Sequence, residues 1–270
     1  MARQVPLLID IGANLTHASF SHDLDAVIAR AADHGVTQLV VTGADERGTG
    51  AARALALAHP GVLYATAGVH PHHAGDFNSD TEALLREFQA KSEVVAVGET
   101  GLDYYRDLSP RTAQLFAFER QLGLAIECGK PLFLHQRDAH SDFISCLDNV
   151  SGRIGQAVVH CFTGDKRELF DYLDRDFHIG ITGWICDERR GTHLRELVKN
   201  IPADRLMLET DSPYLLPRNV TPLPSHRRNE PMYLAHIAVE VARDRGEDVA
   251  VTAANATSTS VRFFGLNPAL

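Results

Sequence analysis

Four side chains that can bind a metal ion stand at the carboxyl ends of apolar, strand-like segments. These residues are Glu99, His135, His160 and Asp211. In a parallel barrel the carboxyl ends of all strands meet at one mouth, so residues far apart in the sequence come together there. Two imidazoles and two carboxylates form a donor set for a divalent cation that activates water. The pattern therefore indicates a metal-dependent hydrolase.

Each of these residues, taken alone, also has a structural interpretation. Glu99 either binds a cation or caps the following helix, although Asp103 is better suited to that capping role. A single histidine in a strand is more often a core residue, but two at equivalent strand ends beside two acids favour metal binding. Asp211 is expected to bind metal and to accept a proton from water. Glu209, two residues earlier, is expected in the barrel interior on the same side.

A second group of histidines follows the apolar segment 62–70. The group contains His70, His72 and His73, and Pro71 restricts the backbone at the bend after the strand. His70 is the best placed of the three to hold a phosphate oxygen when protonated, or a metal when neutral. His72 and His73 are expected on an exposed loop.

Two arginine pairs follow the last two strand-like segments. Loops in these positions often bind phosphate in barrels, and the guanidinium fork matches phosphate oxygens. We expect the pairs to bind substrate phosphates, with solvated loops as the alternative. Three aromatic residues are expected either to stack bases or to pack. The arginines are Arg189, Arg190, Arg227 and Arg228, and the aromatic residues are Tyr104, Tyr105 and Trp184.

Strand-like and helical segments alternate along the chain. This alternation predicts an α/β fold with a parallel sheet, and eight units in about 250 residues favour a (β/α)8 TIM barrel forming one domain over 1–270. A doubly wound sheet is the alternative, but no GxGxxG follows the first strand. The predicted strands are 7–14, 36–43, 62–70, 94–103, 131–138, 156–164, 178–184 and 205–213, and clear helical patterns cover 23–35, 111–129, 232–245 and 249–264.

Composition narrows the possible functions. The chain has 270 residues, of which 44% are hydrophobic, and a net charge of −9. This charge excludes a basic protein that coats DNA non-specifically, but a nuclease with local cations remains possible. The absence of a signal peptide and of a long apolar run predicts a cytoplasmic protein without membrane contact. The four cysteines lack CxxC spacing, which predicts reduced, buried thiols. No GxSxG or P-loop motif is present.

Seven motifs together resemble the TatD family of metal-dependent deoxyribonucleases over nearly the whole chain. They are GVHPHHA, GETGLDYYR, HQRDA, HCFTG, GITGW, ETDSPYL and RRNEP. The resemblance implies a (β/α)8 barrel of the metallo-dependent hydrolase type. It also implies 3′→5′ hydrolysis of single-stranded DNA, with RNA left open, in DNA repair or turnover. Mg²⁺ is the implied ion, with Mn²⁺ or Zn²⁺ as alternatives, and its ligands are Glu99, His135, His160 and Asp211. His70 matches a substrate-phosphate or catalytic histidine.

The chain departs from the family at its first motif. Most members open with Asp-x-His-x-His, whose histidines hold a second metal, whereas this chain has Asp10, Gly12 and Asn14. We therefore expect no tightly held two-metal site. One branch of the family shares this departure, so it does not indicate a dead enzyme. The expected mechanism uses Asp211 or Glu99 as general base, with His70 and the arginines orienting phosphates in a monomeric enzyme.

Two other functions stay open. One is a deacylase of aminoacyl-tRNA on the same barrel, although the implied bridge between two metals in such hydrolases is a carbamylated lysine where this chain has Glu99. The other is a barrel without catalysis that acts as a scaffold, which the loss of the two opening histidines suggests.

Overall fold

The computed structural model describes residues 7–267, in which parallel strands alternate with helices. Eight strands form one sheet in the order β1 to β8, which is the strand order predicted for a (β/α)8 fold. Contacts between residues divide the chain into two compact units. The central unit is Val41–His160 with Arg175–Phe177, and the terminal unit is Met1–Val40, Cys161–Asp174 and His178–Leu270. The single domain over 1–270 stays a prediction.

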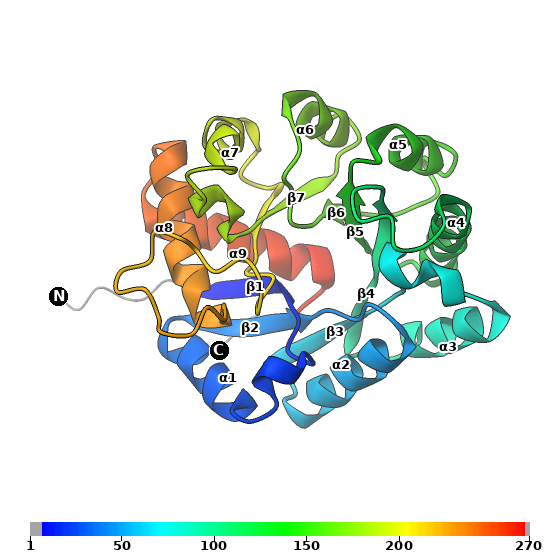
Figure 1. The fold of residues 1–270 in the computed structure, drawn as a ribbon, viewed down its shortest axis with the longest axis horizontal. Coiled ribbons are helices and arrows are strands. Elements are labelled where there is room, and N and C mark those ends of the chain that lie inside the picture. The colour runs from blue at the N-terminus through cyan, green and yellow to red at the C-terminus, as the bar shows by residue number, and fades with distance from the viewer. Residues whose placement is uncertain (1–6, 268–270) are drawn as a thin grey trace. The chain divides into compact units, whose positions relative to one another are not determined.

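The central unit contains four strands and four α-helices. In Figure 1 the helices α2 to α5 lie along one side of these strands. All residues of β3 and β4 are buried, and the rings of Phe118 and Phe143 stack with centroids 5.2 Å apart between α4 and α5. The elements are α2 Glu46–Ala58, β3 Leu63–Ala67, η2 Pro71–Asp76, α3 Ser79–Gln89, β4 Val94–Asp103, α4 Arg111–Cys128, β5 Leu132–Arg137, α5 His140–Asp148 and β6 Ala157–Val159.

The terminal unit contains both the first and the last strands and helices of the chain. Helix α9 packs against β1 and β8, and the rings of His178 and Phe263 meet edge to face at 4.8 Å between β7 and α9. The elements are β1 Leu8–Ala13, η1 Ala18–Phe20, α1 Leu24–Asp33, β2 Val36–Val41 (whose last residue belongs to the central unit), α6 Lys166–Leu173, β7 His178–Ile181, η3 Gly183–Cys186, α7 Thr192–Leu197, η4 Val198–Asn200, β8 Leu206–Leu208, η5 Pro231–Tyr233, α8 Leu234–Arg245 and α9 Val249–Phe264.

The helix ends follow local sequence signals. Helix α3 begins at a capping box, in which the Asn78 side chain accepts from the backbone of Thr81. Helices α4 and α9 end at Gly129 and Gly265, which adopt the left-handed conformation that glycine tolerates best. The predicted bounds of these two helices are therefore correct to within one residue.

Most strands end earlier than the sequence predicts, and β6 and β8 differ most. Strands β6 and β8 each have only three residues, whereas the predicted segments cover 156–164 and 205–213. The chain turns soon after each strand, because Cys161 and Asp211 have φ values of 46° and 53°, outside the extended region. Glu99 lies within β4 at a shift in strand register, so the prediction that it follows the strand is wrong.

The cysteines and the membrane prediction are also tested by the structure. All four cysteines are free, and Cys146 and Cys186 are buried as predicted. The prediction is wrong for Cys128, which is exposed in the last turn of α4, and for Cys161, which is partly exposed. Among residues 7–267 no helix combines the length and the apolar character needed to cross a bilayer.

Candidate metal centre

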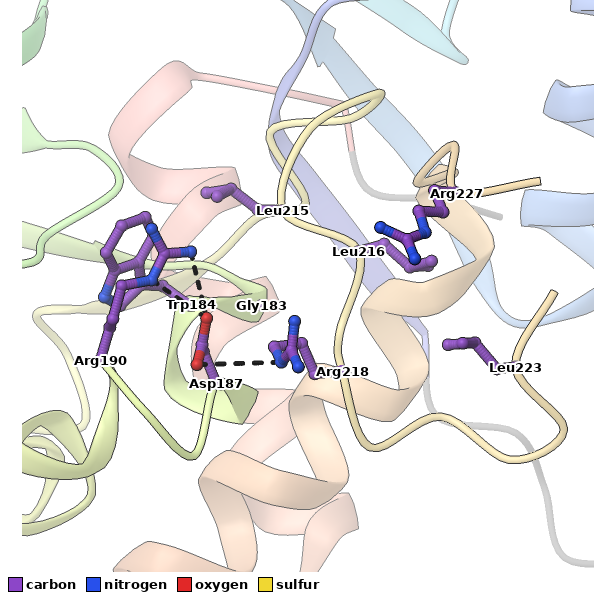
Figure 2. Close-up of a pocket in the computed structure, with 9 residues that line it drawn as sticks. All are labelled: Gly183, Trp184, Asp187, Arg190, Leu215, Leu216, Arg218, Leu223 and Arg227. Carbon is purple, nitrogen blue, oxygen red and sulfur yellow. Dashed lines mark hydrogen bonds and ion pairs between the residues drawn. The ribbon is translucent and has the colours of Figure 1, made fainter. Parts of the chain in front are cut away.

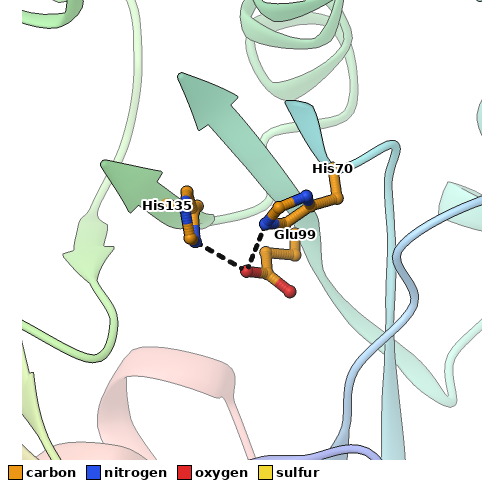
Figure 3. A group of neighbouring side chains, drawn as sticks. All are labelled: His70, Glu99 and His135. Carbon is orange, nitrogen blue, oxygen red and sulfur yellow. Dashed lines mark hydrogen bonds and ion pairs between the residues drawn. The ribbon is translucent and has the colours of Figure 1, made fainter. Parts of the chain in front are cut away.

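Three imidazole rings surround one oxygen of the Glu99 carboxylate. The Oε1 atom of Glu99 lies 2.8 Å from Nε2 of His160, 3.0 Å from Nδ1 of His135 and 3.3 Å from Nε2 of His70. Figure 3 shows His70 and His135 pointing at this oxygen from two sides. Three imidazoles and one carboxylate therefore converge on one small volume in the central unit.

Consecutive strands supply these four residues. His70 follows β3, Glu99 lies in β4, His135 lies in β5 and His160 comes directly after β6. The backbone holds them firmly, since the N–H of Glu99 donates to Gly43 at 2.8 Å and the N–H of His160 donates to Leu134 at 2.9 Å. This arrangement follows from the parallel sheet, which places equivalent strand ends side by side.

Gly98 permits the close packing beside Glu99. Its φ is 144°, and a Cβ at this position would lie 2.2 Å from the carbonyl oxygen of Phe133 on the neighbouring strand. Only glycine fits both the backbone conformation and this approach. The glycine next to Glu99 is thus required by the contact between β4 and β5.

The hydrogen bonds of His70 fix where its proton lies. Its Nδ1 accepts from the backbone N–H of His72 at 3.1 Å, so a neutral ring carries its proton on Nε2. Burial lowers the pKa of His70 to about 4, which keeps the ring neutral at pH 7. Nε2 of His70 is therefore a hydrogen-bond donor. Its ligand atom lies within 4.8 Å of those of Glu99 and His135, but a protonated nitrogen cannot bind a metal.

His135 has the opposite arrangement. Its Nδ1 faces Glu99, while its Nε2 lies 3.5 Å from Oδ2 of Asp103, an ion-pair distance without hydrogen-bond geometry. Burial alone would lower the pKa of His135, but Asp103 and Glu99 together raise it. A proton kept on Nε2 by Asp103 leaves the Nδ1 lone pair free for a cation. His135 is thus the better metal ligand of the two.

Asp103 and His72 were not predicted to take part in this cluster. Oδ2 of Asp103 accepts from Nε2 of His72 at 2.7 Å, while Oδ1 accepts from the backbone N–H of Arg106 at 2.8 Å. The second bond is a local structural role of the kind expected, but the first makes Asp103 part of the centre. His72 and His73 lie in the short helix η2 instead of a loop; His72 is half-buried, so its predicted exposure is wrong, whereas His73 is exposed as predicted.

The charge of Glu99 depends on these histidines. Burial alone would raise the pKa of its carboxyl, but His70, His160 and His135 together hold that pKa well below its usual range. The same balance keeps the pKa of Asp103 low, because the nearby His135 and the hydrogen bonds from His72 and the Arg106 backbone outweigh burial. Both carboxylates are therefore ionised at neutral pH.

The donor set of the centre fits a divalent cation. Two imidazoles, those of His135 and His160, lie at hydrogen-bond distance from the ionised carboxylate of the buried Glu99, and each would release the proton on its facing nitrogen to bind a cation. Nitrogen donors suit borderline ions such as Zn²⁺ and Mn²⁺, and carboxylate oxygens suit Mg²⁺ as well. Glu99, His135 and His160 are thus the central-unit residues that could hold a metal.

Asp211 lies in the terminal unit, where the end of β1 holds it. Its backbone N–H donates to the carbonyl of Gly12 at 2.8 Å, and its Oδ1 accepts from Nδ2 of Asn14 at 2.9 Å. An amide donor at position 14 orients the carboxylate of Asp211. Gly12 and Asn14, which depart from the family motif, therefore have a structural use beside this acid.

Two further acids are buried behind Asp211. Asp10 accepts from both the backbone N–H and the hydroxyl of Thr210, and burial raises its pKa to about 8. Glu209 is fully buried, as predicted, and accepts from the backbone N–H of Cys161. These acids support the segment that carries Asp211.

The two predicted arginine pairs have different surroundings. Arg228 is mostly buried. Its Nη1 and Nη2 atoms each donate to Asp23 at 2.8 Å, and Nη2 also donates to Glu230 at 2.6 Å. The side chain of Arg189 is 58% exposed and contacts Asp187 at 3.4 Å. The guanidinium of Arg228 is thus already held by two carboxylates, whereas that of Arg189 is accessible.

Arg190 and Arg227 line a surface hollow in the terminal unit. Figure 2 shows Trp184 and Asp187 beside Arg190, with Arg218 bonded to the same carboxylate. The guanidinium of Arg190 lies 4.3 Å from the centre of the Trp184 ring. Of the other aromatic residues, Tyr104 and Tyr105 lie under Arg111 and Arg137 at 4.1 and 3.9 Å. All three aromatic residues thus carry an arginine on one face.

Comparisons with known proteins are consistent with this geometry. Residues 9–265 match the family described as TatD related DNase. The protein named 3′-5′ ssDNA/RNA exonuclease TatD from Pantoea ananatis is 48% identical over 259 residues, covering 96% of this chain and 100% of the relative. The protein of the same name from Erwinia billingiae is 51% identical over 241 residues, covering 89% of this chain and 92% of the relative.

Solved structures agree on the fold. The TatD homologue YJJV from Escherichia coli K12 has a TM-score of 0.88 and 26% identity, and the match covers 98% of this chain and 100% of that one. A TatD-family hydrolase from Entamoeba histolytica has a TM-score of 0.86 and 26% identity, with the same coverage. The predicted fold class, an α/β fold of the metallo-dependent hydrolase type, is confirmed.

Proposed function

Because this chain belongs to the family of TatD-related DNases, we propose that it is a metal-dependent 3′→5′ exonuclease of single-stranded DNA and RNA. The relatives that cover nearly its whole length carry this name. The observation that supports the chemistry most directly is the convergence of three imidazoles on the Glu99 carboxylate. A binding protein without catalysis would gain nothing from three histidines and an ionised acid in a buried position.

Glu99, His135 and His160 would hold the cation, and Asp211 is retained from the sequence as a further acidic ligand. A divalent cation polarises a phosphoryl oxygen and lowers the pKa of water. Mg²⁺ is our proposed ion from the family resemblance, while the imidazole donors make Mn²⁺ and Zn²⁺ effective alternatives.

His70 would act as a donor to substrate. Its Nε2 proton, fixed by the bond between Nδ1 and the backbone of His72, is available to a phosphate oxygen that competes with Glu99. Asp211 is the proposed general base, because a carboxylate can accept a proton from water. The hydrogen bond from Asn14 to the carboxylate and the one from the Asp211 backbone to the Gly12 carbonyl keep the acid in place.

Asp103 and His72 would position the metal ligands. Asp103 favours a proton on Nε2 of His135, which leaves Nδ1 free to bind the cation. His72 occupies the other side of the same Asp103 oxygen and limits its movement. These two residues act through His135 and are not proposed to contact substrate.

The exposed arginines would contact the strand. Arg189, Arg190 and Arg227 are accessible and can bind phosphates in the fork geometry. Arg228 would act mainly through its bonds to Asp23 and Glu230, which hold the segment that carries Arg227.

Digestion of a 5′-labelled single strand with Mg²⁺, Mn²⁺ or Zn²⁺ tests the proposal. A ladder that shortens from the 3′ end, and that EDTA abolishes, is the expected result, with duplex DNA and an RNA copy beside it to rank the substrates. Asp211→Asn should lose activity by orders of magnitude while its circular dichroism and melting curve stay unchanged. Uncleaved strands with every ion, or full activity in Asp211→Asn, would refute the assignment.

Location and assembly follow from the same proposal. We propose a monomer that works on nucleic acid in the cytoplasm, in repair or turnover of DNA. Light scattering coupled to gel filtration should give the mass of one chain, 29.6 kDa. A mass of two or more chains would contradict the monomer.

A further inference from the structure

The surface hollow of the terminal unit combines positive charge with an apolar wall. It has a volume of about 360 Å³, within the range of small-ligand sites, about 300–1,000 Å³. Arg190, Arg218 and Arg227 provide the charge, and the wall is formed by Trp184, Leu215, Leu216 and Leu223. Both features are unusual on the surface of a chain with a net charge of −9.

One buried carboxylate orients the arginines at the base of the hollow. Asp187 is 3% exposed, and its Oδ2 accepts from Nε and Nη2 of Arg190, each at 3.1 Å. Its Oδ1 lies 3.9 Å from Nε of Arg218 and accepts from the backbone of Arg189 at 2.9 Å. The backbone and guanidinium groups around it hold the pKa of Asp187 below its usual range despite burial. The arginines are therefore arranged before any ligand binds.

The charges around the hollow do not balance. Asp187 and Glu188 are the acids that pair with the arginines here, and Arg218 contacts Glu188 at 3.4 Å. Four arginines, at positions 189, 190, 218 and 227, thus face two carboxylates. Arg227 is exposed and forms no ion pair with any other residue in the part of the chain that the structure describes. An anionic group would complete this set of charges.

The apolar wall restricts the kind of anion. Leu223 is 58% exposed although it lines the hollow, and Trp184 is partly exposed beside the guanidinium of Arg190. Inorganic anions gain nothing from such a wall, whereas a nucleobase buries its face against apolar and aromatic groups and stacks on a guanidinium plane. Phosphate and base together match the two halves of the hollow.

We propose that this hollow binds one nucleotide of a single-stranded nucleic acid, with its phosphate on Arg218 and Arg227 and its base against Trp184 and the leucines. The inference rests on the proposed exonuclease function and adds a subsite to it. It explains why an acidic protein can hold a polyanion, since the phosphates meet a local excess of positive charge. It also makes recognition tolerant of sequence, because every base has a face that can stack.

Two oligonucleotides of equal length distinguish the contribution of the phosphate contacts to binding from that of the base contacts. One is a short, labelled oligothymidylate, and the other has the same phosphates but abasic sugars. Fluorescence anisotropy in EDTA, over a series of salt concentrations, measures binding without cleavage. Arg227→Gln and Trp184→Leu are the test variants. Arg167→Gln is the control for loss of one exposed charge, since Arg167 is 84% exposed on α6.

Arg227→Gln should weaken binding of both strands about tenfold and reduce the slope of log K against log salt by about one. Trp184→Leu should weaken binding of oligothymidylate at least about fivefold and leave binding of the abasic strand unchanged. Arg218→Gln should weaken binding as Arg227→Gln does. If Trp184→Leu fails to fold, the two arginine variants still test the phosphate half of the subsite. Arg167→Gln should bind both strands like the wild type.

The outcomes separate this inference from the proposed function. Test variants that bind like the control, or a wild type that binds neither strand, would overturn the subsite. A wild type that binds both strands, with the losses stated above, but cleaves neither DNA nor RNA when a cation is restored would refute the exonuclease and support the subsite. If the wild type cleaves the strand, but Arg227→Gln, Arg218→Gln and Trp184→Leu bind as tightly as the wild type, the exonuclease is supported and the subsite is refuted.

Discussion

Glu99 and Glu230 are both buried acids surrounded by basic side chains, but the bases differ. Imidazoles surround Glu99 in the central unit, whereas Arg30 and Arg228 bind Glu230 in the terminal unit at 2.8 and 2.6 Å. Histidine can give up a proton and bind a cation through its lone pair, while the guanidinium group stays protonated and has no lone pair to offer. The cluster around Glu99 can therefore exchange protons for a metal. The cluster of Glu230, Asp23, Arg30 and Arg228, called the clamp below, has no lone pair on its bases and can only form ion pairs.

The two clusters also differ in what each partner contributes. Asp103 and His72 orient one imidazole of the first cluster. In the second, Asp23 adds another carboxylate, so that Arg228 bonds to acids on two segments distant in sequence. Two acids thus belong to a candidate reaction centre in one unit, and two others to a fixed contact between chain segments in the other. The following changes test this distinction, in order of decreasing expected effect.

Replacement of Glu99 should have the largest effect, and on activity alone. Glu99→Gln keeps the size of the side chain but removes the charge that a cation needs, so kcat/KM should fall on the order of a thousandfold or more. Cleavage of labelled single-stranded DNA measures the loss, and Glu127→Gln, at an exposed position on α4, is the control. Near-normal cleavage by Glu99→Gln would remove this residue from the centre.

Replacement of Arg228 should affect stability instead. Arg228→Met leaves Glu230 buried without one of its partners, which should lower the free energy of unfolding by about 3 kcal/mol, roughly a hundredfold in the equilibrium. Urea denaturation measures the change, and Arg167→Met, at an exposed arginine, should change it by less than about 0.5 kcal/mol. A variant as stable as the wild type would show that this clamp contributes nothing, and that Arg228 is free for another role.

Replacement of Asp103 should weaken the cation site without abolishing it. Asp103→Asn keeps an acceptor for the Arg106 backbone but no longer favours the proton on Nε2 of His135, so cation affinity should fall about tenfold. Titration calorimetry with Mn²⁺ gives the affinity directly. Asp107→Asn, on the exposed loop nearby, should bind Mn²⁺ like the wild type, and equal affinities in the two variants would contradict the role of Asp103.

Acid should weaken the clamp by a smaller, graded amount. Bonds to Arg228 and Arg30 lower the pKa of Asp23, and those bonds outweigh burial to lower the pKa of Glu230, from ordinary values of 3.8 and 4.5. A carboxyl whose folded pKa is lowered stabilises the protein above its unfolded pKa and loses that contribution as pH falls towards the folded value. The Tm difference between wild type and Arg228→Met should therefore be constant above about pH 5 and shrink below about pH 4. A difference that stays constant down to pH 3 would rule out this titration.

Much of the fold was predictable because it depends on local pattern. Alternation of apolar strands with amphipathic helices gave the eight strands in their order, and Gly129 and Gly265 marked helix ends. The placement of His135 and His160 towards strand ends predicted that they would meet, since parallel strands align their ends, and Glu99 joins them from within β4. The ends of β6 and β8 were not predicted: the apolar residues Cys161 and Phe162 continue past the end of β6, whereas the polar residues Glu209, Thr210 and Asp211 directly follow β8.

The sequence by itself determined which residues could do chemistry, and the tertiary structure decided which of them do so together. His70 and His72 differ by two positions and look alike in sequence, but one faces Glu99 and the other Asp103. Arg227 and Arg228 are neighbours, yet one is exposed beside a hollow and the other is held by Asp23 and Glu230. Residue type fixes what a side chain can bind, whereas its partners can be far away in sequence, as Asp23 is 205 positions from Arg228, and only the folded chain brings them close.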